Sequence, residues 1–78
     1  MRKHEELTNP NSCMSRARPN EMTFVLLARD EAAPSAIREW CAKRVSLGKN
    51  KLSDAQIQEA LKCADEMDLE RQVLKGGK

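Results

Sequence analysis

Three cysteines and one histidine are the side chains of this sequence that most readily bind metals or act as nucleophiles. Cys13, Cys41 and Cys63 lie far apart and include no CxxC pair, so the only candidate for a fourth zinc ligand is His4 in a polar stretch. An odd number of cysteines argues against a disulfide scaffold and is typical of a reducing cytoplasm. We therefore expect no metal site and a cytoplasmic location.

No arrangement of residues predicts a catalytic centre. His4 lies in a polar stretch, so no serine or cysteine has a positioned general base. Gly48 stands alone and lacks the glycine spacing of a phosphate-binding loop. A run of carboxylates follows, but neighbouring residues of a helix point in different directions, so a solvated acidic face is expected at Asp65, Glu66, Asp68 and Glu70. We expect a protein that is not an enzyme and has no cofactor.

Basic residues are concentrated in the middle of the chain, although the net charge is only +2. Such a cluster attracts phosphates or an acidic protein surface. Part of the cluster leads into the expected start of the last helix, where free backbone N–H groups favour anions. The sequence therefore predicts an anion or ligand site formed by Arg29, Arg38, Arg44, Lys49, Lys51 and Ser53.

Two other kinds of partner are disfavoured. In a helix–turn–helix arrangement the last predicted helix would enter the major groove, yet it carries mostly carboxylates, which DNA phosphates repel. No apolar run approaches the roughly 18 residues needed to cross a bilayer. We therefore expect neither specific DNA binding nor a membrane partner.

Helical periodicity and helix-end signals predict a small all-α fold. Pro34 suits the first turn of a helix, and Gly48 is the expected stop after it. Ser53 and Gln56 match a capping box at the start of the last helix. A chain of 78 residues allows one small domain at most. The sequence predicts a three-helix domain with helices over residues 21–32, 34–47 and 54–73.

The two ends of the chain are expected to lie outside this domain. Residues 1–20 are rich in asparagine, serine and proline, so they bury too little apolar surface to offset the entropy lost on ordering. We predict a disordered polar tail over residues 1–20, a single helical domain over residues 21–74 and a frayed C-terminus over residues 75–78.

The apolar run at residues 23–28 has a second interpretation. Its β-branched and aromatic residues favour a strand, whereas good helix formers surround it and Asn20 suits an N-cap. A strand needs a partner, and no second strand candidate is found in the sequence. We prefer the helix over residues 21–32. The alternative is a strand at residues 23–28 that pairs across a homodimer, beside a two-helix hairpin.

The predicted helical faces form a small core and leave some apolar residues over. The expected core residues are Phe24, Leu27, Ile37, Trp40, Val45, Ile57, Leu61, Ala64 and Met67. A chain this short buries only about 60% of the surface that its unfolded form exposes, and oligomerisation is a common additional source of stability. The leftover residues predict a homo-oligomer with Val25, Leu26 and Leu69 at its interface.

A pattern in the middle of the chain resembles short, functionally uncharacterised accessory proteins of bacteriophages and prophages. The residues that carry the resemblance are F-V-L-x-A-x-D at 24–30, the pair Ala33-Pro34, then Ile37 and Trp40. The likeness covers about half of the chain. It implies an accessory protein that acts by binding inside a host cell.

Two binding functions are compatible with these features. The first is an oligomeric module that sequesters a phosphorylated, nucleotide-like ligand to counter host defence, with the basic cluster as its anion contacts. The alternative is a protein-binding inhibitor or adaptor that acts on a host protein through the leftover apolar residues. The basic cluster and the absence of a catalytic arrangement favour the first of these.

Overall fold

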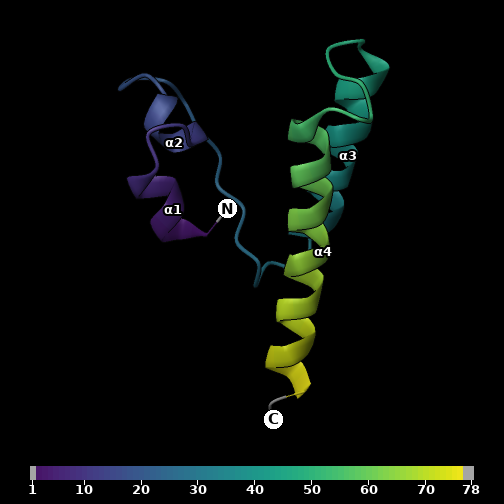
Figure 1. The fold of residues 1–78 in the computed structure, drawn as a ribbon. Helices are drawn as coiled ribbons and strands as arrows, with labels where there is room; N and C mark the ends of the chain where they lie inside the picture. The colour runs from purple at the N-terminus through teal and green to yellow at the C-terminus, as the bar shows by residue number, and fades with distance from the viewer. Residues whose placement is uncertain (1, 77–78) are drawn as a thin grey trace.

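The computed structural model describes residues 2–76, with side chains described for residues 2–73. Residues 2–76 form four helices and no strand (Figure 1). The helices are α1 (Lys3–Thr8), α2 (Cys13–Arg16), α3 (Ala33–Ser46) and α4 (Ala55–Gly76). The predicted small all-α fold is confirmed, with α2 only 4 residues long. The helices expected over 34–47 and 54–73 correspond to α3 and α4. Of the C-terminus expected to fray, residues 75–76 belong to α4 and residues 77–78 lie outside the described residues.

The N-terminal segment contains two short helices, where a disordered tail was expected over residues 1–20. Ser12 joins them and is 1% exposed. Its hydroxyl donates to the backbone carbonyl of Glu6 in α1 and accepts from the N–H of Ser15, 3.1 Å away, in the first turn of α2. The Glu6 carboxylate also accepts from the N–H of Met14 at 2.7 Å. Polar caps of this kind satisfy helix ends without an apolar core, so composition did not indicate them.

Residues 21–27 form an extended segment that connects α2 to α3. The helix predicted over residues 21–32 is wrong. A short helix is stable mainly through packing of its apolar face, and here Phe24 is 88% and Met22 is 96% exposed. A turn ends the segment, because the N–H of Asp30 donates to the carbonyl of Leu27 at 2.9 Å. No other segment of residues 2–76 pairs with this one, so the strand of the alternative prediction, which requires a second copy of the chain, stays a prediction.

α3 begins and ends close to the residues predicted from the sequence. The carboxylate of Asp30 accepts from the N–H of Ala32 at 2.9 Å just before the helix, and Pro34 occupies its first turn. Gly48 has a φ of +71° after the last turn, and the N–H of Lys49 donates to the carbonyl of Arg44 at 3.1 Å. A left-handed glycine with this hydrogen bond is a common helix end.

α4 begins directly after Asp54, and the hydrogen bonds at this point centre on Asp54 and not on Ser53, the predicted cap. The carboxylate of Asp54 accepts from the N–H of Lys51 at 3.0 Å and from the side-chain amide of Asn50 at 2.9 Å. Gln56, the expected partner of Ser53 in a capping box, instead accepts from Asn50 at 3.3 Å. The loop therefore closes around Asp54, which lies at the positive end of the helix dipole.

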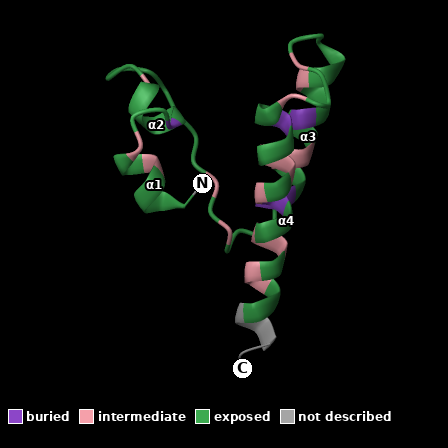
Figure 2. Cartoon of the chain, viewed as in Figure 1, coloured by how far each residue is buried: buried purple, intermediate pink, exposed green. Residues whose placement is uncertain are grey.

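The core lies between α3 and α4, which pack side by side (Figures 1 and 2). Figure 2 shows buried stretches of the hairpin where α3 and α4 meet. The buried residues of these helices are Ala33, Pro34, Cys41, Ile57 and Ala64. Small residues here let the backbones approach, and the Cys41 thiol lies 4.0 Å from the carbonyl oxygen of Ile57.

Of the nine residues expected in the core, only Ile57 and Ala64 are fully buried. Three others are half-buried: Ile37, Leu61 and Met67. The remaining members are exposed, which contradicts the prediction for Phe24, Leu27, Trp40 and Val45. Phe24 and Leu27 were assigned to a helix that does not form, so they have no helical face to pack.

The chain is less compact than its length would allow. Its radius of gyration is 13.8 Å, and its principal extents are 41 × 29 × 20 Å. A compact chain of 78 residues has a radius of about 11.5 Å. The α1–α2 unit stands beside the α3–α4 hairpin and is connected to it by the extended segment (Figure 1). Among the described residues, no helix is long and apolar enough to cross a membrane.

Candidate functional site

Arg38, a predicted anion contact, is paired with carboxylates of the chain itself. Its Nη2 atom donates to Asp65 at 2.9 Å and to Asp68 at 2.7 Å, both on α4. The hydrogen bonds that Arg38 donates to Asp68 and Asp65 raise its pKa. Because two negative groups already surround this guanidinium, an incoming phosphate would have to displace them. The acidic run of α4 therefore has a structural partner that sequence spacing did not reveal.

Arg44 is also engaged within the chain. Its Nε atom donates to the side-chain oxygen of Asn50 at 2.6 Å, and its guanidinium lies 5.6 Å from the centre of the Trp40 ring. This cation–π contact explains how Trp40 is stabilised on the surface at 42% exposure instead of in the core. Asn50 thus connects the end of α3 to Asp54 at the start of α4.

The six predicted ligand residues do not converge on one small site. Arg29 lies in the turn before α3, whereas Lys49, Lys51 and Ser53 lie in the loop after it, all exposed. α3 has 14 residues and is therefore about 21 Å long, which separates the two groups. The N-terminus of α4 already holds the carboxylate of Asp54, whose pKa is lowered by hydrogen bonds from Asn50 and the Lys51 backbone. A negative charge at this point disfavours an anion.

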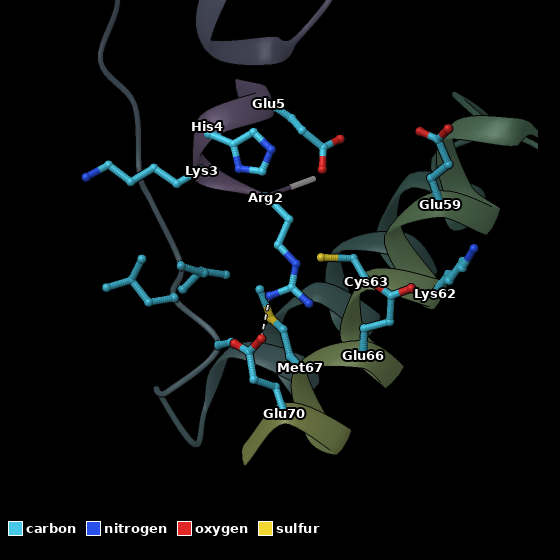
Figure 3. A pocket seen from close by; sticks show the side chains of 13 residues that line it. Arg2, Lys3, His4, Glu5, Glu59, Lys62, Cys63, Glu66, Met67 and Glu70 are labelled. Carbon is cyan, nitrogen blue, oxygen red and sulfur yellow. Dashed lines mark hydrogen bonds and ion pairs between the residues drawn. The ribbon is translucent and has the colours of Figure 1, made fainter. Parts of the chain in front are cut away.

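A cavity of about 840 Å³ lies between α1, the extended segment and α4 (Figure 3). An ion pair between Arg2 and Glu70 crosses it. Cys63 and Met67 project from α4 toward Arg2, as Figure 3 shows. The cavity is lined by the basic residues Arg2, Lys3 and Lys62 and by the acidic residues Glu5, Glu59, Glu66 and Glu70. Because the two charges are present in similar number, the cavity has no strong preference for an anion.

The cysteines and carboxylates are the side chains that could bind a metal ion. No group of three or more potential metal ligands is found among the described residues. Cys41 is 3% exposed, and burial raises the pKa of its thiol, which disfavours the reactive thiolate. Cys13 is exposed and Cys63 is half-buried, each as a free thiol.

A second hollow of about 790 Å³ is formed by α1, α2 and the extended segment. We call it the apolar groove. Six large, solvent-exposed apolar side chains line it: Leu7, Met14, Met22, Phe24, Val25 and Leu27. All six lie within the first 27 residues. Among the described residues, the more extensive packing between helices is that of α3 against α4. Contiguous exposed apolar side chains of this kind mark surfaces that bind other molecules.

The residues predicted at an oligomer interface lie in two places. Val25 and Leu26 belong to the extended segment. Val25 is 59% exposed, and Leu26 is half-buried. Leu69 lies on α4 at 61% exposure and does not line the groove. Sequence reasoning missed Leu7 and Met14, because the segment that contains them was assigned to a tail. The hydrogen bonds of Ser12 order that segment, and a serine gives no apolar signal.

Comparison of the chain with protein-family models, curated proteins and solved structures gave no match. The resemblance to phage and prophage accessory proteins therefore stays a prediction.

Proposed function

We propose that the chain is a non-enzymatic interaction protein that binds a protein partner through the apolar groove. The observation that carries this proposal is the exposure of Met22, Phe24 and Val25 at 96%, 88% and 59% along one wall. Burying apolar surface is the main favourable term in protein association. Large aromatic and methionine side chains are also enriched in the cores of interfaces. The corresponding activity is that of an inhibitor or adaptor.

Three features of the charge distribution favour this function over sequestration of a phosphorylated, nucleotide-like ligand. Arg38 is paired with two carboxylates. Asp54 occupies the helix N-terminus where an anion was expected. The remaining basic residues of the predicted site lie before α3, near its end and in the loop after it. A phosphate site requires several convergent donors, and these features separate or neutralise the donors.

The resemblance to phage accessory proteins leads us to propose a host protein as the partner, in the cytoplasm. Leu7, Met14 and Phe24 are the anchors that such a partner would cover. Charged residues at the rim of the groove, including Lys3, Glu6 and Arg16, would contribute more to orientation and association rate than to affinity.

Site-specific photo-crosslinking tests this function. A benzophenone amino acid replaces Phe24 in one variant and Leu47, 56% exposed beyond the end of α3, in a matched control. Both variants are illuminated in the expressing cell, and adducts are identified by mass. We expect adducts with a different protein at position 24 and few at position 47. Equal labelling at the two positions, or no adduct with a different protein at position 24, would show that the groove does not bind such a partner.

A further inference from the structure

We infer that residues 23–27 of the extended segment pair in antiparallel fashion with the same residues of a second copy of this chain, across a two-fold axis at Val25. This inference rests on the proposed function, because the segment is one wall of the apolar groove. It names a second copy of the chain as the molecule that contacts this wall and antiparallel strand pairing as the geometry of the contact. A dimer of this kind brings two grooves together while leaving the walls formed by α1 and α2 available.

The backbone of the segment is ready for strand pairing. Within the described part of the chain, the backbone N–H and C=O groups of residues 22–26 make no hydrogen bond to another backbone group. The neighbouring bonds, from Glu21 to Arg18 and from Asp30 to Leu27, close turns at either end. Thr23, Phe24 and Val25 are residue types that favour strands. An exposed edge of this composition is a template for pairing with another chain.

Charge complementarity selects one register. When Val25 faces its own copy, Glu21 of one chain comes level with Arg29 of the other, just beyond the paired residues 23–27, and the same pair forms twice. One carboxylate oxygen of Glu21 accepts from the N–H of Arg18 at 3.0 Å within its own chain, and the other faces outward toward the second copy in this arrangement. Shifting the register by one residue places Glu21 opposite Ala28 in one direction and opposite Asp30, a like charge, in the other. Cross-strand pairs of opposite charge stabilise a sheet, and like charges destabilise it. The long side chain of Arg29 allows contact from the turn just beyond the strand.

The exposed area of the single chain is large enough for such an interface. The chain exposes 6556 Å², about 1,800 Å² more than the roughly 4,800 Å² expected for a compact protein of 8.8 kDa. A standard interface covers about 800 Å² on each partner. A dimer through the segment would therefore cover part of the surplus and leave apolar surface for a second protein.

Charge-reversal variants test both the dimer and its register. E21R places arginines at both positions, and R29E places glutamates at both. Each variant alone would put like charges opposite each other and weaken dimerisation by about tenfold. An equimolar mixture would restore opposite charges and form heterodimers with near wild-type affinity. Sedimentation equilibrium measures affinity, native mass spectrometry identifies the pairs, and circular dichroism checks folding. K43E, a charge reversal on the exposed face of α3, is the matched control.

The inference requires a concentration-dependent dimer of the full chain, weakened in each single variant and recovered in the mixture, with K43E like wild type. A monomeric wild-type chain at about 100 μM, or variants that dimerise as well as wild type, would overturn it. The photo-crosslinking result separates this failure from failure of the proposed function. A monomer that still gives adducts with a different protein at position 24 retains the function without the dimer.

Discussion

Nη2 of Arg38 on α3 donates to Oδ2 of Asp68 on α4 at 2.7 Å, so this ion pair, together with the one to Asp65, connects the two helices of the hairpin. Arg71, on the same helix as Asp68, lies 3.4 Å from its other carboxylate oxygen. The hydrogen bond from Arg38 is the main cause of a lowered pKa at Asp68. The pair therefore links the stability of the hairpin to the ionisation of one carboxyl group.

Acid should weaken the hairpin through Asp68. Because the pKa of Asp68 in the folded chain lies below its unfolded value of about 3.9, its contribution to stability is complete above that value. The contribution is lost as the pH falls through the folded pKa. We expect Asp68→Asn to lower the melting temperature by a few degrees at pH 7, and the difference from wild type to shrink toward pH 3. Thermal unfolding followed by circular dichroism measures this. Glu39→Gln, at an exposed position of α3, is the control; the same pH-dependent difference in that variant would contradict the assignment to Asp68.

Ile57 should be the most sensitive position of the hairpin core. It is 0% exposed and faces Cys41 across the seam between α3 and α4. Truncating a buried isoleucine to alanine costs about 2–5 kcal/mol, which is a large part of the stability of so small a fold. We expect Ile57→Ala to be largely unfolded at 37 °C. Val73→Ala, at a residue 72% exposed on the same helix, should change stability by less than about 0.5 kcal/mol. Chemical denaturation distinguishes these outcomes, and similar midpoints for the two variants would show that the seam is not the core.

The hairpin could be predicted from the sequence because its signals are local. Pro34 and Gly48 restrict the backbone where they stand, and the apolar spacing around Ile57 continues for several turns. The extended segment could not be predicted, because the helix and strand tendencies of Thr23, Phe24 and Val25 oppose each other. Packing decides such a case, and the single chain provides no packed neighbour for this stretch.

The candidate site was predicted less well, for a related reason. Proximity in sequence suggested that Arg38 and Arg44 belong to one basic cluster. In three dimensions Arg38 lies against carboxylates about thirty residues away, and Arg44 lies over Trp40. The apolar groove depends on α1 and α2, whose order comes from polar capping and not from hydrophobic periodicity. Val25 and Leu26 were nevertheless correctly picked out as apolar residues left outside the core.

The start of α4 allows a direct comparison between the capping box predicted at Ser53 and the hydrogen bonds that Asp54 makes with the preceding loop. Asp54 accepts hydrogen bonds from the backbone of Lys51 and the side chain of Asn50, whereas Ser53 is exposed. We expect Asp54→Ala to lower the melting temperature by several degrees and Ser53→Ala to leave it nearly unchanged. Acid should reduce the effect of Asp54→Ala, since the pKa of this carboxyl is lowered in the folded chain and its contribution disappears as it is protonated. A larger decrease in melting temperature for Ser53→Ala than for Asp54→Ala would contradict this and support the capping box that the sequence predicts.

The order of the N-terminal unit should depend on Ser12. Its hydroxyl is the contact that connects Glu6 at the end of α1 with Ser15 in α2, and it is 1% exposed. Replacing an N-cap serine with alanine costs about 0.5–2 kcal/mol, and the loss here falls on the α1–α2 unit because the hairpin has its own core. Ser12→Ala should therefore speed amide hydrogen exchange over residues 3–16 by about two- to thirtyfold and leave exchange in the centre of α3 and α4 unchanged. Ser46→Ala, at an exposed position in the last turn of α3, is the matched control. Uniform acceleration across the whole chain would instead mean that the N-terminal unit and the hairpin unfold together.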